Sequence, residues 1–152
     1  GGAAQCRDCH AAAGVGAVRV HIVIPGPPVA KGRARVLKSG RSYTPAKTAN
    51  YSAKVAHLGK QAMGIDGPYN GALSVFIGVN KEIPASWSKR KRADALAGII
   101  KPVSRPDGDN YEKAILDGLN GVVWHDDGQV VDMTWRKRYA AQPCVVVSVE
   151  PA

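Results

Sequence analysis

Alternation of apolar and polar side chains predicts three of the three or four β-strands that we expect. Val18, Val20, Ile22 and Ile24 take every second position before a proline-rich stretch begins at Pro25. Residues 73–79 show the same period after an Asp-Gly-Pro turn, and residues 131–136 repeat it with one polar face. Residues 144–149 form an almost continuously apolar run that predicts a last strand. The alternating apolar positions of the second and third strands are Leu73, Val75, Ile77, Val79, Val131, Met133 and Trp135.

Two stretches have the spacing of amphipathic helices. The first is predicted to begin with Thr44 as N-cap and Pro45 at the first helical position, and to run to about Met63 before Gly64. The second is predicted to begin at Asp109, with Glu112 completing a capping box, and to end at Gly118 or at Asn120-Gly121. Their expected buried stripes are Tyr51, Val55, Leu58 and Ala62 in the first helix, and Tyr111, Ala114, Ile115, Gly118 and Leu119 in the second.

These elements, with a short helix expected near residues 86–92, predict an α+β fold. A small mixed sheet packed with two or three helices suits one compact domain over residues 18–152. Residues 1–17 are rich in Gly and Ala and lack an amphipathic period, so we expect a flexible extension there. No apolar run approaches the length of a membrane span and no stretch resembles a secretory signal, so we expect a cytoplasmic protein.

The three cysteines point to no cofactor. Cys6, Cys9 and His10 match a haem-attachment pattern, and the Cys pair could be half a zinc site. Neither has support, because nothing signals export and the remaining cysteine, Cys144, lies in a predicted strand. We expect Cys144 to be a buried packing residue.

Charge is distributed unevenly along the chain. The net charge is +9, yet residues 107–132 hold seven acids against the single base Lys113, a net charge of −6. The rest of the chain has 20 bases and five acids, a net charge of +15. A carboxylate cluster in a basic protein is typical of a metal-dependent enzyme that acts on a polyanion.

The acids are spaced to meet around the second helix. Asp109, Lys113 and Asp117 follow one another at four-residue steps on its polar face, and Asp107 lies two residues before its predicted start. The apolar run 122–124 could bring the Asp126-Asp127 pair back beside that start. Carboxylates from separate backbone points are the ligands that Mg²⁺ prefers. A simpler interpretation is that these acids cap a helix and form an ordinary turn. An EF-hand is excluded by the pattern after residue 110.

Two basic segments are candidates for DNA contact. Five bases follow the first strand in a loop or hairpin with a Ser39-Gly40 turn, and four consecutive bases accompany Trp87. Both could instead be solvated surfaces. The expected DNA-binding residues are Lys31, Arg33, Arg35, Arg41, Lys89, Arg90, Lys91 and Arg92.

The motifs together resemble the RusA family of Holliday junction resolvases, in particular its phage and prophage branch. The resemblance rests on PDGDN at 106–110, KAILDGLNG at 113–121 and VWHDDGQV at 123–130. Segments 25–35, 40–50 and 84–98 also match in the right order, so the likeness covers about residues 18–150. One departure is Gly108, where the family usually has a larger residue; we expect it to loosen the backbone between the two flanking aspartates.

The resemblance implies a RusA-like fold and a set of site residues. Asp107, Asp109 and Asp127 match the metal-binding and catalytic acids, and Lys113 matches a catalytic lysine. Asp117, Asp126 and Lys137 match accessory positions, and the bases at 136–138 would add positive charge near the carboxylates. It further implies Mg²⁺, with Mn²⁺ as a substitute, and a homodimer acting on four-way DNA junctions in recombination and repair.

The expected reaction is hydrolysis of a phosphodiester, with paired nicks in a four-way junction. The three aspartates would hold one or two Mg²⁺ ions that activate water, and Lys113 would neutralise charge on the phosphate. Two alternatives stay open. One is a Mg²⁺-dependent nuclease for flaps or forks, and the other is a non-catalytic DNA- or junction-binding protein.

Overall fold

The structure, a computed structural model, describes residues 20–32 and 35–152. The predicted 1–17 extension, Val18 and Arg33 lie outside the described residues. The strands are β1 (Val20–Pro25), β2 (Arg35–Val36), β3 (Ser42–Tyr43), β4 (Leu73–Glu82), β5 (Val130–Ala140) and β6 (Cys144–Pro151). The helices are α1 (Ala46–Met63), α2 (Lys89–Leu96) and α3 (Gly108–Leu119), with a 3₁₀ helix at Asp127–Gln129.

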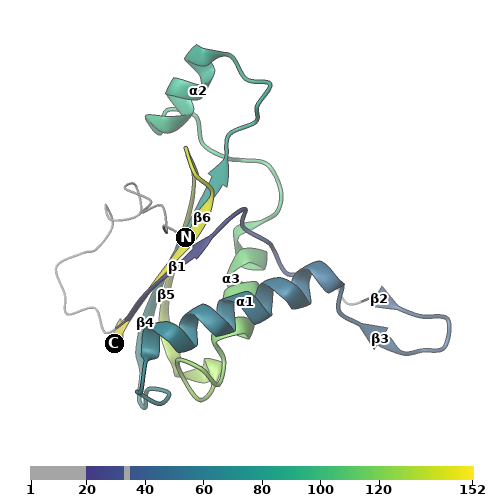
Figure 1. Ribbon diagram of the computed structural model, residues 1–152, viewed down its shortest axis with the longest axis vertical. Helices are drawn as coiled ribbons and strands as arrows, with labels where there is room; N and C mark the ends of the chain where they lie inside the picture. The colour runs from purple at the N-terminus through teal and green to yellow at the C-terminus, as the bar shows by residue number, and fades with distance from the viewer. Residues whose placement is uncertain (1–19, 33–34) are drawn as a thin grey trace.

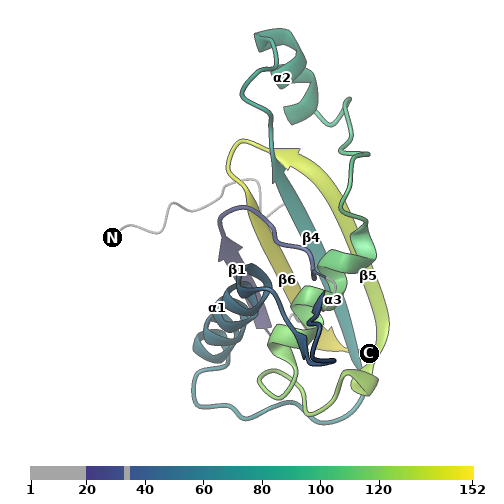
Figure 2. The ribbon, with the colours of Figure 1, turned by 90° about the vertical axis from the view of Figure 1, so that its right-hand side faces the viewer.

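Four strands form a mixed sheet in the order β1-β6-β4-β5. β6 pairs antiparallel with β1 and with β4, whereas β4 and β5 run parallel, with α2 and α3 in the connection between them. Figure 2 shows α1 and α3 in front of one face of this sheet. The α+β class and the single mixed sheet predicted from the sequence are confirmed.

The hydrophobic core lies between this face and the two helices. The alternating apolar residues of β1 and β4 are buried in it, as predicted, together with Val145, Val147 and Val149 of β6. All five residues of the predicted α3 stripe are buried. A Cβ added to Gly118 would lie 2.6 Å from Val55, and one added to Gly59 would lie 2.6 Å from Leu119. Glycine at these two positions therefore lets α1 and α3 approach closely.

Two elements project from this body. The hairpin of β2 and β3 extends to one side, and α2 stands beyond the end of the sheet at which β4 finishes (Figure 1). The hairpin turns at residues 38–40, where Gly40 has a φ of 80°, so the predicted Ser39-Gly40 turn is confirmed. Ser88 caps α2 by accepting a hydrogen bond from the Lys91 N–H.

The predicted helix starts need correction. Pro45, not Thr44, is the N-cap of α1, because the Pro45 carbonyl accepts the first helical N–H, from Ala49. The buried track of α1 includes Gly59 and Met63, while Leu58 is half-buried and Ala62 is exposed. Because α3 packs closely against α1 at Gly59, the face of α1 that carries Gly59 and Met63 lies toward the core.

α3 begins two residues earlier than predicted. Asp107 is its N-cap, so Asp109 lies in the first turn and forms no capping box with Glu112. The capping box forms instead at the 3₁₀ helix, where Asp126 and Gln129 satisfy each other's backbone N–H groups.

β5 departs from simple alternation at its first residues. Leu73 pairs with Val130 and Ser74 pairs with Asp132, so the register shifts and Val131 is left exposed. The prediction that Val131 alternates in phase with Met133 and Trp135 was therefore wrong. In the part of the chain that the structure describes, no helix has the length and apolar character needed to cross a bilayer.

Candidate functional site

Two lysines hold the segment that leads into α3. Lys137 of β5 donates to the backbone carbonyls of Ser104 (3.2 Å) and Pro106 (3.3 Å). Lys81 of β4 donates to the Ser104 hydroxyl and to the Arg105 carbonyl, each at 3.4 Å. Burial, with a further contribution from the nearby Lys137 ammonium, lowers the pKa of Lys81. Two ammonium groups on the α3 side of the sheet therefore position the chain immediately before Asp107.

Asp107 and Asp109 lie at the start of α3 with their carboxylates accessible. Asp107 is the N-cap residue, yet its side chain makes no cap hydrogen bond. The Asp109 carboxylate lies 3.6 Å from the Lys113 ammonium, and both side chains are 59% exposed. An ion pair this exposed contributes little to folding. Capping therefore does not account for Asp107, and the helix dipole favours negative charge at this end.

Gly108, between the two aspartates, is tightly packed. It is buried, and a Cβ at this position would lie 2.1 Å from the ring of Trp135. The indole of β5 therefore occupies the space that a side chain at 108 would need. The expectation that Gly108 loosens the backbone is not met, because Trp135 packs against it and restrains the start of α3.

Asp127 is bonded to a core residue. Its Oδ1 accepts a hydrogen bond from Nε1 of Trp124 at 2.8 Å, and the Trp124 side chain is fully buried. Asp126, beside it, accepts from the Gly128 N–H and caps the 3₁₀ helix. The structure therefore gives both acids a local structural contact.

Gln129 ties this loop to the rest of the fold. Its Oε1 accepts from the backbone N–H groups of His125 (2.7 Å) and Asp126 (3.1 Å). Its Nε2 donates to the carbonyls of Tyr69 (2.8 Å) and Gly71 (3.1 Å). This network fixes the place of the Asp126-Asp127 pair.

The fold separates Asp127 from Asp107 and Asp109. The start of α3 lies beside residues 135–137 of β5, whereas Asp127 opens the 3₁₀ helix that leads into β5 at residue 130. Five to seven residues of strand span roughly 16–23 Å. Among residues 20–32 and 35–152, no three His, Cys, Asp or Glu side chains are grouped so that they could hold a metal ion. The described residues of one chain therefore do not bring the three aspartates together around a single ion. Their shared metal site stays a prediction.

Asp117 pairs with a residue of the N-terminal loop. Its carboxylate lies 2.6 Å from the Lys31 ammonium, with both side chains 43% exposed, and the Lys31 N–H donates to the Asn110 carbonyl. Lys31, predicted to bind DNA, therefore also fastens its loop along α3. Positive and negative charges therefore alternate along the polar face of α3. Lys113 pairs with Asp109, and Lys31 from the N-terminal loop pairs with Asp117.

Of the predicted DNA-binding residues, Arg35 and Arg41 belong to the projecting hairpin and residues 89–92 belong to the projecting α2 (Figure 1), whereas Lys31 lies along α3. All four bases at 89–92 are exposed, but Lys91 lies over the Trp87 ring at 4.0 Å and Arg92 donates to the Pro84 carbonyl. Arg41 is exposed on the hairpin. The structure describes Arg35 by its backbone in β2 alone.

Sequence reasoning missed Lys81 and the role of Trp135. Neither has a motif, because Lys81 is the last residue but one of a strand of ordinary composition and Trp135 looks like one more alternating apolar residue. Their contacts depend on the parallel pairing of β4 with β5, which places both residues on the α3 side of the sheet.

Comparison with known proteins identifies relatives over most of the chain. A family model described as "Endodeoxyribonuclease RusA" matches residues 25–150. A protein of Bacillus subtilis (strain 168) that bears the name "Uncharacterized protein YqaN" is 35% identical over 136 residues, which cover 86% of this chain and 94% of the relative. The family match includes α1, α2, α3, β4, β5, nearly all of β6 and the acidic motifs, and it begins at the last residue of β1.

Proposed function

Since the chain belongs to the RusA endodeoxyribonuclease family, we propose that it is a Mg²⁺-dependent nuclease that resolves four-way DNA junctions by paired nicks. The observation that carries the proposal is the pair Asp107 and Asp109. Both are exposed at the start of α3, and the Asp107 side chain makes no cap hydrogen bond. The ammonium groups of Lys81, Lys113 and Lys137 contact residues at or just before the start of α3.

The donor chemistry of the pair fits a hard divalent ion. Mg²⁺ in phosphoryl-transfer sites is commonly held by one or two carboxylates, with water and substrate oxygens completing its shell. Asp107 and Asp109 are the residues that would hold it, and Mn²⁺ would take the same oxygen ligands. When bound, such an ion supplies an activated water and stabilises charge on the phosphate.

The neighbouring lysines have distinct proposed roles. Lys113, 3.6 Å from Asp109, would contact the phosphate or balance the carboxylates. Lys137 acts as a positioning residue through its two backbone hydrogen bonds to the segment before Asp107. Asp117 and Asp126 are proposed as supports, since one fastens Lys31 and the other caps the 3₁₀ helix.

Asp127 is proposed as a catalytic residue because of its place in the family motif, although within one chain it lies apart from Asp107 and Asp109. Its hydrogen bond to Trp124 gives it a separate structural contribution. The two roles can be distinguished, because Asp127→Asn keeps an oxygen that can accept the indole N–H, whereas Asp127→Ala does not. We expect both variants to lose metal-dependent cutting, and the alanine variant alone to lose stability, by about 1 kcal/mol for the hydrogen bond.

A homodimer is the proposed assembly, acting in DNA recombination and repair. A four-way junction has two-fold symmetry and needs two nicks, which two identical sites related by a two-fold axis would supply. Its arms would be recognised by shape and phosphate contact, with the hairpin and α2 as the proposed contact elements.

The test is cleavage of a labelled synthetic four-way junction with Mg²⁺, with Mn²⁺ and with chelator. We expect the native chain to cut with either metal, Asp109→Asn to bind without cutting, and the matched control Asp66→Asn, exposed in a turn far from α3 in sequence, to cut normally. Cutting by Asp109→Asn, or cutting in chelator, would contradict the proposal. Faster cutting of flaps or forks than of junctions would favour that nuclease class, and binding without any metal-dependent cutting would favour a junction-binding protein.

A further inference from the structure

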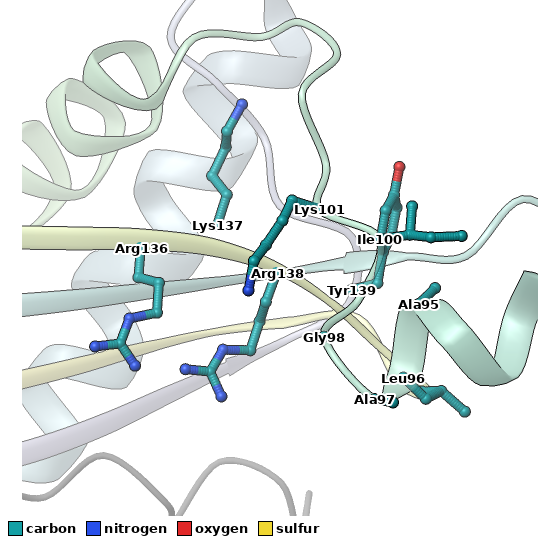
Figure 3. Close-up of a pocket in the computed structure, with 10 residues that line it drawn as sticks. All are labelled: Ala95, Leu96, Ala97, Gly98, Ile100, Lys101, Arg136, Lys137, Arg138 and Tyr139. Atoms are coloured by element: carbon teal, nitrogen blue, oxygen red, sulfur yellow. The ribbon is translucent and has the colours of Figure 1, made fainter.

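A basic pocket lies between the end of α2 and the second half of β5. Its volume is about 470 Å³, and its walls are residues 95–98, 100 and 101 on one side and residues 136–139 on the other (Figure 3). Four of the lining residues are basic and none is acidic: Lys101, Arg136, Lys137 and Arg138.

Three of these bases are available to a ligand. Lys137 uses its ammonium on backbone carbonyls before α3, and Figure 3 shows its side chain extending to the opposite side of β5 from Arg136 and Arg138. In the described part of the chain, Lys101, Arg136 and Arg138 form no ion pair with an acid. Arg136 lies over the Phe76 ring, with 5.8 Å from its guanidinium carbon to the ring centroid. Uncompensated cations gathered in a pocket create a potential that favours an anion.

The spacing of the two arginines suits an extended polyanion better than a single small anion. They are two residues apart on one strand face, hence roughly 7 Å apart along β5. Figure 3 shows both arginine side chains extending from the same side of β5, and Lys101 lines the same pocket. Each guanidinium can donate two parallel hydrogen bonds to phosphate oxygens, so the pair can contact successive phosphates.

The pocket lies at the edge of β5 and is lined from both sides of the strand, by Lys137 and Tyr139 on the side that faces α3 and by Arg136 and Arg138 on the other. Trp135 and Lys137 face α3, so Arg136 and Arg138 face away from it. Among the residues that the structure describes, β5 is the edge strand of the sheet, and no further strand separates its two sides. A nucleic acid that passes over this edge would therefore meet both the aspartate pair and the pocket.

We propose that Lys101, Arg136 and Arg138 bind the sugar–phosphate backbone of a DNA arm outside the cut site. This inference rests on the proposed function for the identity of the polyanion and deepens it by naming a second contact surface. It predicts binding without sequence preference and with strong salt dependence, because phosphate contacts release counterions.

The experiment measures binding of the full chain to a labelled four-way junction at several salt concentrations, in chelator so that no cutting occurs. The variants are Lys101→Gln, Arg136→Gln, Arg138→Gln and the triple variant. Lys60→Gln, an exposed lysine in the last turn of α1, is the matched control. Each pocket variant is expected to reduce the slope of log K against log salt by about 0.9, and the triple variant by about 2.7. The control should leave the slope unchanged.

A second measurement needs no variant. Acylation of Lys101 in the native chain, followed by mass spectrometry, should fall when the junction is bound, while acylation of Lys60 should not. An unchanged slope in the triple variant together with unprotected Lys101 would overturn the inference. Loss of cutting in Asp109→Asn neither supports nor contradicts the inference about the pocket, since that variant should keep the native slope of log K against log salt. A native chain that never cuts, yet loses binding in the triple variant, would overturn the nuclease proposal and leave the pocket in place.

Discussion

Replacing Gly108 by alanine tests how closely the start of α3 is packed. The added Cβ would lie 2.1 Å from two ring carbons of Trp135 and 2.5 Å from a third. These distances are far inside van der Waals contact, so either the indole or the first turn of α3 must move. Trp135 is 41% exposed, which gives its ring room to swing toward solvent and lose its contact with the helix.

Two opposing effects set the magnitude. Overpacking of this kind costs about 1–3 kcal/mol. Alanine is favoured over glycine in helix interiors by up to about 1 kcal/mol, and by less at a first helical position. We therefore expect Gly108→Ala to lower the free energy of unfolding by about 1–2 kcal/mol, and the melting temperature by roughly 2–8 °C for a chain of this length.

The assay is chemical denaturation of four proteins: the native chain, Gly108→Ala, Trp135→Leu and the double variant. Gly67→Ala is the matched control, because its Cβ would meet nothing within 4 Å. If the indole causes the loss, alanine at 108 should cost less than about 0.5 kcal/mol in the Trp135→Leu background, since residues in contact show such coupling. An equal cost with and without the indole, or a Gly108→Ala protein as stable as the native chain, would refute the packing argument.

Three further outcomes are expected. Lys137→Met should slow metal-dependent cutting while leaving junction affinity within about twofold, because the Lys137 side chain holds the loop before α3. Restored cutting in Lys137→Arg would support a role in positioning through hydrogen bonds. Gln129→Ala removes four hydrogen bonds to backbone groups and should cost about 1–3 kcal/mol by denaturation, against little change for the exposed Gln61→Ala. Burial raises the pKa of Tyr51 and of Tyr111 above 10.0. Their contribution to the free energy of unfolding is therefore complete below pH 10 and is lost as pH rises further. In a pH series of melting temperatures, Tyr51→Phe should make the loss of stability at alkaline pH shallower.

Local pattern was sufficient for most of the framework. The stripe of α3 is buried at all five predicted positions, and β1 and β4 bury the residues whose alternation predicted them. These features depend on side-chain periodicity over a few turns or a few strand residues, which can be recognised in neighbouring positions. Boundaries were less well predicted. Asp107 and Asp109 are both good N-cap types, so the choice between them depended on how the chain approaches α3.

The candidate site likewise contains residues that the sequence identified and residues whose place only the fold decided. The motif around Asp107 and Asp109 is contiguous, so its chemistry could be recognised without a fold. The position of Asp127 could not, because its distance from that pair depends on where the 3₁₀ helix enters the sheet. Trp135 and Lys81 gave no signal, since their contacts with the α3 region form only once β4 and β5 pair in parallel.

By itself the amino-acid sequence determined which segments become helices and strands, which acids are gathered in one stretch, and that the remaining chain is strongly basic. Tertiary structure alone decided that an indole packs on Gly108, that two lysines hold the approach to α3, and that the side chains of Arg136 and Arg138 extend from the side of β5 opposite to Lys137. The physical reason is the separation along the chain of the residues that interact. Periodicity and composition act between neighbouring residues, whereas these contacts join residues tens of positions apart and depend on strand order and register.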